Sequence, residues 1–353
     1  MKVALFSDLH VFHHFNKSQF EDIAQSFVYH LFEYCKENNI QKIFFLGDWF
    51  HIKNKLYVPP FIKSVEVLRA IRDAGIEIIF LIGNHDAPQM GTTDYSIIYA
   101  FEEFGEVIPL YDWKDESDCR FHFLSYTKEL PEFEFGKKKN ILFGHLDINS
   151  FVMEQGFECK EGFNINEFNK FDIVFSGHFH KHQIKKNIVY IGSPYQVRFS
   201  ERFDDKGFIV LDTETLKWNF ETYDSAPKFK DVDVDSFEEE DIVGNFIRIR
   251  THKDNADLSN LKNKFLSLGA ESVDFIFEDE NEQEELNVIE DLTMGSIGEI
   301  ASSYFDTVKE QSLFNPQLTE LIEKSVVEKN DFMNIFKEIE EAHLSGWKPQ
   351  ADD

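Results

Sequence analysis

The chain has few cysteines and no hydrophobic run of membrane-spanning length. Cys35, Cys119 and Cys159 are odd in number and share no metal-type spacing within the 353 residues. They predict reduced thiols and a cytoplasmic location, and they argue against a disulfide framework. The N-terminus has no secretory signal layout and begins at once with a predicted strand, so we expect no membrane contact.

Positive charge is scarce as well. The sequence holds 36 Lys and Arg against 65 Asp and Glu, which gives a net charge of −29. The imbalance is largest beyond residue 227, where 12 basic residues face 31 acidic ones. Such acidity argues against broad, unassisted binding to nucleic acid. It leaves open a nucleic-acid enzyme whose site holds cations, or whose partner supplies the basic surface.

Apolar, β-prone segments alternate with helical segments along the first 90 residues. Strands are predicted at 2–6, 41–46 and 76–82, and helices at 18–37 and 59–74. Strands that are apolar throughout are typical of a parallel sheet covered on both faces, so this region predicts an α/β fold. A short helix at 94–104, strands at 140–143, 168–175 and 187–191, and a hairpin of 207–212 with 217–222 extend it to a domain spanning 1–225.

A boundary near residue 226 precedes a second, smaller module. Residues 226–278 are predicted to form a small α+β domain, with strands at 242–251 and 272–277 and a helix at 257–268. An acidic linker covers 279–292, and the region 293–353 holds two predicted helices. A helical pair this small can hardly bury both apolar faces alone, so we expect it to dock on a partner.

Polar residues directly follow five of the predicted strands. Ligand sites of open α/β sheets gather beyond the carboxyl ends of the strands, so we expect these side chains to converge. His178 and His180 lie two residues apart, and on an extended segment their imidazoles point the same way. Two divalent transition metals, bridged by one Asp, would suit the set. Its members are Asp8, His10, Asp48, Asn84, His85, His145, His178 and His180.

A cluster of this kind predicts hydrolysis of a phosphoester. Two metals about 3.5–4 Å apart bind a hydroxide and the phosphoryl oxygens, and they offset charge on the attacking and leaving groups. A free histidine beside the leaving oxygen would act as an acid or would stabilise the transition state. His85 suits this role because it follows the predicted ligand Asn84 and is expected to point elsewhere.

Five short motifs resemble those of the calcineurin-like metallophosphoesterase superfamily. They are Asp8-x-His10, Gly47-Asp48, Gly83-Asn84-His85-Asp86, Gly144-His145 and Gly177-His178-x-His180. Three longer segments are similar to the SbcD family of DNA-repair nucleases. They are Gly47 to His51, Gly177 to Gln183, and Tyr190 to Pro194 followed by Phe199-Ser200-Glu201 and Lys206-Gly207-Phe208. The compact length also resembles the phage recombination endonuclease subunits of that family.

The resemblance implies a fold and a set of roles. The fold would be α/β, with a four-layer α-β-β-α metallophosphoesterase core, a small α+β capping domain and C-terminal helices. Two Mn²⁺ ions, with Mg²⁺ as the alternative, would be the cofactors. Asp8, His10 and His180 would hold one metal, Asn84, His145 and His178 the other, and Asp48 would bridge them. His85 would be catalytic, and His51 would assist near the scissile phosphate.

The resemblance also implies partners. Residues 226–278 would cap DNA, and 293–353 would bind an SbcC-like ABC-type coiled-coil ATPase. The chain would form a homodimer, for which helices 59–74 and 94–104 are candidates. Basic residues near the site are candidates for DNA contact: Lys53, Lys55, Lys181, Arg198 and Arg202. The implied activity is 3′–5′ exonuclease and endonuclease cleavage of DNA in repair or recombination, in the host cytoplasm if a phage encodes the protein.

Two other functions are compatible with parts of the sequence. A metallophosphoesterase acting on small nucleotides or phosphoproteins would use the same metal chemistry. The Gly192-Ser193-Pro194 segment and the C-terminal modules weigh against it, because an enzyme of small substrates needs neither. The other is a scaffold that keeps the fold but mainly binds a partner, and the intact set of predicted ligands argues against it.

Overall fold

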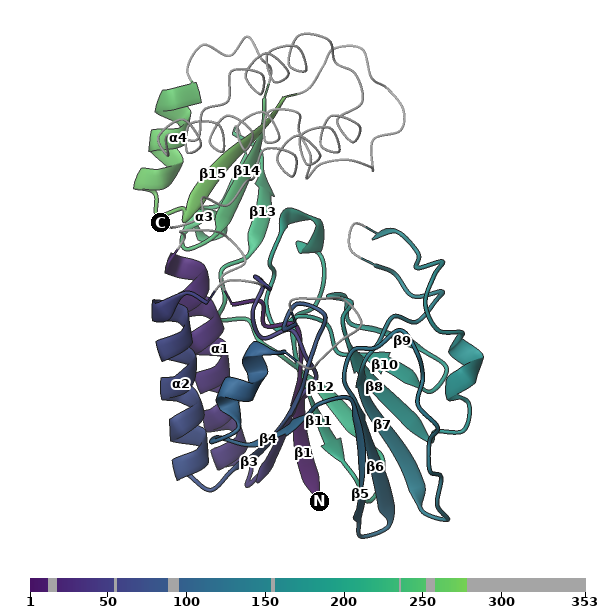
Figure 1. Ribbon diagram of the computed structural model, residues 1–353. Coiled ribbons are helices and arrows are strands. Elements are labelled where there is room, and N and C mark those ends of the chain that lie inside the picture. Colours follow the sequence, from purple (N-terminus) through teal and green to yellow (C-terminus); the bar gives the residue numbers. More distant parts are fainter. Residues whose placement is uncertain are drawn as a thin grey trace, which may run out of the picture. The chain divides into compact units, whose positions relative to one another are not determined.

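The computed structural model describes most of the first 277 residues (Figure 1). The described ranges are 1–11, 18–53, 56–87, 95–153, 156–234, 236–251 and 258–277. The chain divides into two compact units, Met1–Asn281 and Glu282–Asp353, and every described residue belongs to the first. The predicted linker at 279–292, the predicted helices of 293–353 and Lys55 therefore lie outside the described residues.

The first sheet has six strands in the order β12-β11-β1-β2-β3-β4. The strands β1 to β4 pair in parallel, and β11 and β12 add antiparallel strands beside β1. Their bounds are β1 Lys2–Phe6, β2 Lys42–Phe45, β3 Glu77–Leu81, β4 Glu106–Ile108, β11 Gly207–Asp212 and β12 Trp218–Thr222. Helices α1 (Ser18–Glu37) and α2 (Val58–Asp73) pack on the outer face of this sheet, as Figure 1 shows.

The second sheet also has six strands, in the order β5-β6-β7-β8-β10-β9. Their bounds are β5 Tyr111–Glu116, β6 Cys119–Leu124, β7 Lys139–His145, β8 Ile173–Gly177, β9 Gln183–Lys185 and β10 Ile188–Tyr190. Short 3₁₀ segments in the described connections include η1 Ile97–Phe101, η3 Ile165–Phe168 and η4 Phe199–Glu201. Within the described residues of the predicted helix at 94–104, only Ile97–Phe101 is helical, and it forms the 3₁₀ segment η1. The start of the predicted strand at 168–175 belongs instead to the η3 turn.

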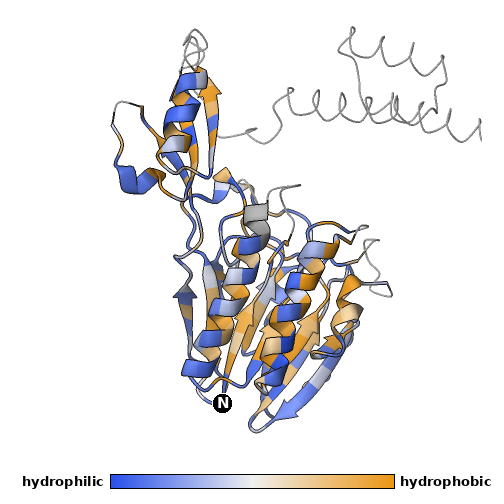
Figure 2. Ribbon diagram, turned by 90° about the vertical axis from the view of Figure 1, so that its left-hand side faces the viewer, coloured by the Kyte–Doolittle hydropathy of each residue, from blue (hydrophilic) through white to orange (hydrophobic). Residues whose placement is uncertain are grey.

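The two sheets pack face to face through aromatic side chains. Phe44 of β2 lies 4.9 Å from Phe143 of β7 and 5.2 Å from Phe123 of β6, measured between ring centroids. Phe175 of β8 stacks on Phe143 at 6.0 Å. Edge-to-face and stacked contacts of this kind are favourable for aromatic side chains, so they help to hold the two sheets together. Figure 2 shows the strands as largely hydrophobic and the two long helices as mixed, as expected for sheets between covering layers.

The α/β class and the sandwich of two sheets are confirmed. The outer face of the second sheet is covered by loop residues and by the η3 turn, including Phe151, Phe168 and Phe179, which are buried. No helix in the described ranges has the length and apolarity that a membrane span requires.

A third sheet follows the sandwich in the chain. Its strands run parallel in the order β13-β14-β15, with bounds Phe229–Val232, Phe246–Thr251 and Ser272–Phe277. Helices α3 (Glu239–Ile242) and α4 (Leu258–Ser267) accompany it. The predicted strand–helix–strand pattern is present, and β13 is an additional strand. Its charged residues Lys230 and Asp231 concealed it, because they interrupt the apolar pattern.

Candidate metal centre

Polar residues from both sheets meet beyond the carboxyl ends of their strands. Asp8 and His10 follow β1, Asp48 follows β2, Asn84 follows β3, His145 ends β7, and His178 and His180 follow β8. Several adopt the left-handed backbone that non-glycine residues rarely use. The φ angles are +54° at Asp8, +45° at His10, +64° at Asp48 and +99° at His178. Such strain is concentrated at functional sites, where the surrounding structure holds it in place.

Asp8, His10 and His180 form a first group of possible metal ligands. One ligand atom from each lies within 4.8 Å of the others, and all three side chains are buried. The Nε2 atoms of His10 and His180 are 2.9 Å apart. Burial raises the pKa of Asp8, and the nearby His145 and His180 oppose that rise. This group draws its members from the connections after β1 and β8, which are far apart in sequence.

A second group contains Asn84, His145 and His178. The Oδ1 atom of Asn84 lies 3.0 Å from His145 Nε2 and 2.8 Å from His178 Nδ1, and the two ring nitrogens are 3.3 Å apart. The other ring nitrogen of His145, Nδ1, donates to the carbonyl of Leu46 at 2.7 Å. That bond leaves His145 Nε2 as the ring nitrogen that faces the group.

Asp48 lies between the two groups. Its Oδ2 is 3.6 Å from His10 Nε2 and 3.4 Å from His145 Nε2, and the side chain is buried. Burial by itself would raise the pKa of Asp48, but His145 and His85 outweigh it and lower the pKa below its ordinary value. Burial likewise opposes protonation of His145, yet the charges of Asp48 and Asp8 raise its pKa to about 9. One carboxylate therefore faces both groups of ligands.

These groups suit metal ions. In the second group an amide oxygen and two imidazole nitrogens turn toward one another at hydrogen-bonding distances, and all three are lone-pair donors in the neutral state. A cation at their centre makes that arrangement favourable. Carboxylate, amide and imidazole ligands together suit divalent transition metals. The Asp and His residues of this cluster could therefore hold metal ions.

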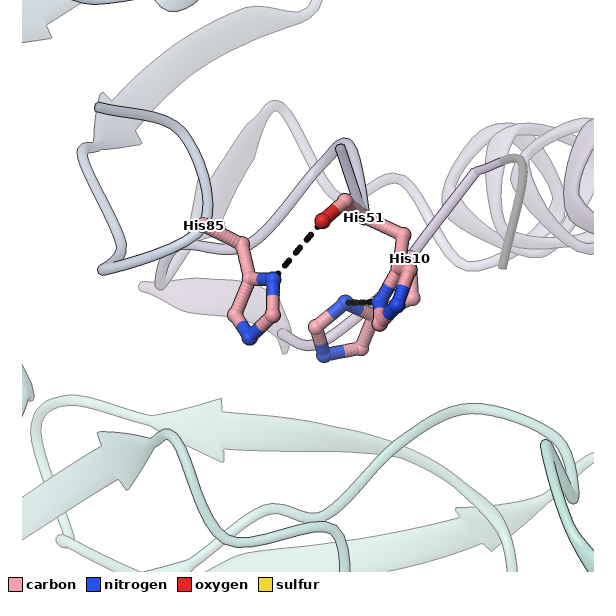
Figure 3. A group of neighbouring side chains, drawn as sticks. All are labelled: His10, His51 and His85. Carbon is pink, nitrogen blue, oxygen red and sulfur yellow. Dashed lines mark hydrogen bonds between the residues drawn. The ribbon is translucent and has the colours of Figure 1, made fainter. Parts of the chain in front are cut away.

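His85 and His51 lie beside the first group (Figure 3). His85 Nδ1 donates to the backbone carbonyl of His51 at 2.8 Å, and the two rings stack with centroids 4.9 Å apart. The backbone N–H of His85 donates to Asp48 Oδ1 at 2.7 Å. Burial lowers the pKa of His51 to about 3, with His85 and Arg198 adding to the effect. Together with His10, these two histidines form a third group of close ligand atoms.

Asp86 organises the loops that carry these residues, and sequence reasoning assigned it no role. Its buried carboxylate accepts backbone N–H bonds from Asp48 at 2.7 Å, Trp49 at 2.9 Å, Phe50 at 3.2 Å and Gly83 at 2.9 Å. It thereby joins the connection after β2 to the connection after β3. The signal was present, because Asp86 belongs to the same strand-end motif as Asn84 and His85.

Two further carboxylates contact the site, and sequence reasoning missed both. Asp147 contacts His178, and Glu201 contacts His180. Asp147 lies two residues after His145, but no spacing rule connects it with His178. Glu201 is in a segment that resembles SbcD proteins, although that resemblance implied no role for it.

The basic residues proposed for DNA contact are mostly held by carboxylates. Lys181 Nζ lies 3.2 Å from Asp204, and Arg202 Nε lies 2.8 Å from Asp231 of β13. Arg198 Nε is 3.9 Å from Glu201. Lys53 is half-buried. These arginine and lysine contacts support the local structure, and a role toward DNA remains a prediction.

The sequence is similar to known phosphoesterases and nucleases. The sequence model of the calcineurin-like phosphoesterase family matches residues 1–182, which include every strand-end ligand described above. Exonuclease subunit 1 of Enterobacteria phage T4 is 26% identical over 206 residues, which cover 53% of this chain and 58% of the phage protein. The SbcD subunit of the SbcCD nuclease from Staphylococcus epidermidis is 32% identical over 121 residues, 32% of either chain.

Both alignments cover only part of each protein. The chain spans 58% of the length of the phage relative and 32% of the staphylococcal one. A solved archaeal phosphodiesterase aligns with 63% of this chain and all of its own, at 13% identity and a TM-score of 0.35. That likeness is too low to bear on function.

Proposed function

Because the chain belongs to the calcineurin-like phosphoesterase family, we propose that it is the nuclease subunit of an SbcCD-like complex that hydrolyses DNA phosphodiesters. The observation that carries the proposal is the position of Asp48. One buried carboxylate faces His10 at 3.6 Å and His145 at 3.4 Å, and so reaches both groups of ligands. The names of the two similar proteins, an exonuclease subunit and a nuclease subunit, support a nucleic acid as the substrate.

The proposed ligands fall into two sets. Asp8, His10 and His180 would hold one Mn²⁺, Asn84, His145 and His178 would hold the other, and Asp48 would contact both. Mg²⁺ is the alternative metal. When bound, a pair of divalent metals stabilises charge on phosphoryl oxygens and lowers the pKa of water.

His85 is the proposed proton donor to the leaving 3′ oxygen. Its Nδ1–H is held by the carbonyl of His51, so Nε2 is the ring nitrogen that exchanges a proton with substrate. Its backbone N–H donates to Asp48 Oδ1 at 2.7 Å, which ties the backbone of residue 85 to the proposed bridging ligand. Burial lowers the pKa of His51 to about 3, so this ring stays neutral beside His85.

The remaining regions of the chain complete the proposal. Residues 1–225 would be the nuclease domain, 226–278 a DNA-capping domain, 279–292 a linker, and 293–353 the region that binds an SbcC-like ATPase. The nuclease would cut as a 3′–5′ exonuclease and as an endonuclease, as a homodimer in the cytoplasm, in repair or recombination. Retention of the ATPase by the full chain, and its loss on deletion of 293–353, tests the partner, while light scattering tests the dimer.

The nuclease activity is tested with labelled linear and hairpin DNA in Mn²⁺. We expect degradation from the 3′ end and cleavage near the hairpin. His85→Ala should reduce it by about 10²–10⁴-fold, because a positioned acid contributes about that factor. His30→Ala is the matched control, since His30 is exposed on α1 and packs against Tyr223. Turnover of p-nitrophenyl phosphate esters without any DNA cleavage would favour the small-substrate alternative instead.

A further inference from the structure

The two histidines after β8 turn different nitrogens toward the cluster. His178 presents Nδ1, which lies 2.8 Å from Asn84 Oδ1 and 3.3 Å from His145 Nε2. His180 presents Nε2, which lies 2.9 Å from His10 Nε2. A neutral imidazole carries one proton and one lone pair, so the two rings need opposite tautomers to offer lone pairs here. Their spacing in the sequence does not select those tautomers.

Asp147 faces the outer nitrogen of His178. Its Oδ1 lies 2.5 Å from His178 Nε2. Behind it, Asp147 Oδ2 accepts from the hydroxyl of Tyr126 at 3.1 Å and from the ammonium of Lys128. The exposed fraction of both the Asp147 and the His178 side chain is 16%, so the contact is largely shielded from water. This carboxylate can receive the Nε2–H of His178, and it has its own counter-charge in Lys128.

Glu201 faces the outer nitrogen of His180 in the same way. Its Oε1 lies 2.9 Å from His180 Nδ1, and its Oε2 lies 2.8 Å from Lys206 Nζ. Lys206 also donates to the backbone carbonyl of His180 and to Ser193 Oγ, each at 2.8 Å. Glu201 and Lys206 are both buried. Their ion pair holds the ring and the backbone of His180 from one side.

We propose that Asp147 and Glu201 are positioning residues that set opposite tautomers in His178 and His180. Asp147 takes the Nε2–H of His178, and Glu201 takes the Nδ1–H of His180. Each ring then directs its lone pair at a different metal, so two histidines only two residues apart serve separate sites. A carboxylate on the far nitrogen also raises the basicity of the near one. The inference rests on the two-metal function proposed above.

The tautomers can be measured directly in the full-length, metal-free protein. Two-dimensional ¹⁵N–¹H correlation spectra of histidine-labelled protein distinguish Nδ1–H from Nε2–H rings, and His178→Gln and His180→Gln assign the signals. We expect Nε2–H in His178 and Nδ1–H in His180. Asp147→Ala should mix the tautomers of His178 alone. Glu201→Asp keeps the charge beside Lys206 but shortens the side chain, and it should mix those of His180 alone.

Metal affinity provides the second measurement. Titration with Mn²⁺ should show two classes of site, with one weakened by about 10–100-fold in Asp147→Ala and the other in Glu201→Asp. Asp115→Ala is the matched control, because Asp115 is exposed on β5 and pairs with Arg120 and Lys138. The same tautomer in both wild-type rings, or unchanged tautomers and affinities in both variants, would overturn the inference. Expected tautomers without DNA cleavage would contradict the proposed function and leave the inference standing.

Discussion

At the scale of single residues, Asp86 does the most to shape the candidate metal centre without facing it. Its carboxylate accepts four backbone N–H groups, from Asp48, Trp49, Phe50 and Gly83. These donors belong to two connections that carry Asp48 and Asn84. A buried donor without a partner costs about 1–3 kcal/mol, so a single side chain accounts for several kcal/mol of local order.

Removal of this carboxylate should therefore be costly. We expect Asp86→Ala to lower the free energy of unfolding by about 3 kcal/mol or more, because the four donors lose their acceptor at a buried position. Asp86→Asn keeps one acceptor oxygen and should lose less. Urea denaturation followed by circular dichroism measures both. A loss below about 1 kcal/mol in Asp86→Ala would show that water or a neighbouring group replaces the carboxylate.

The three cysteines lead to a prediction about how slowly their thiols react at pH 8. All three are buried and free, and burial raises the pKa of each, to about 12 for Cys35. The thiolate is the reactive form, so at pH 8 Cys35 should react more than about a thousandfold more slowly than an ordinary thiol. Labelling with a thiol reagent at pH 8 should detect almost none in the native state and three in denaturant. Rapid native labelling of Cys35 would contradict its burial.

At the scale of elements, the strand ends bring the ligands together because the connections pack without space between them. Gly83 follows β3 and lies next to Asp48. A Cβ atom at Gly83 would lie 2.1 Å from Asp48 Oδ1 and 2.3 Å from its backbone nitrogen. The connections after β2 and β3 can approach this closely only because residue 83 has no side chain.

Gly83→Ala should consequently displace Asp48. We expect Mn²⁺ affinity to fall by at least about tenfold and thermal stability to drop, since the close contact involves backbone as well as side chain. Isothermal titration and thermal denaturation measure the two effects. Gly136→Ala is the control, because its Cβ would meet only the flexible end of Arg120, at 3.3 Å. Equal affinities in both variants would mean that the connection after β3 shifts freely.

At the scale of the whole molecule, the net charge of −29 matters for the candidate metal centre, because the acidic surface and the buried cluster can both attract divalent ions. The two buried carboxylates of the centre, Asp8 and Asp48, repel each other when no cation lies between them. Many exposed carboxylates also attract divalent ions without forming a site. A test of metal binding must therefore distinguish the buried cluster from the acidic surface.

Metal addition and removal should change the stability of the whole chain. At a free Mn²⁺ concentration of 100 times Kd, one site stabilises the native state by about 2.7 kcal/mol, and a chelator should reverse the effect. His85→Ala should keep the shift in melting temperature, because His85 is not a proposed ligand. Asp48→Asn should lose most of it. A shift that survives Asp48→Asn would come from the acidic surface instead.

Much of this protein was determined by local sequence. Apolar periodicity predicted helices at 18–37 and 59–74, which the structure has at Ser18–Glu37 and Val58–Asp73, because that pattern reflects which face a segment buries. The strand ends that carry Asp8, Asp48 and Asn84 follow from apolar runs in the same way. Convergence of Asp8, Asp48 and Asn84 also follows, since strands of one sheet end at a common edge, whereas their meeting with His145 and His178 of the second sheet depends on how the two sheets pack. The sequence therefore identified residues that the structure brings together, and their role as metal ligands stays a prediction.

The tertiary structure alone decided which side chains support those ligands. Asp147 lies 31 residues from His178, and Glu201 lies 21 residues from His180, so neither contact leaves a trace in local periodicity. The strand β13 could not be identified from local pattern either, because its charged residues pair with other elements, as Asp231 does with Arg202. Local pattern reports what a segment buries, whereas the choice of hydrogen-bond partner depends on how distant segments pack.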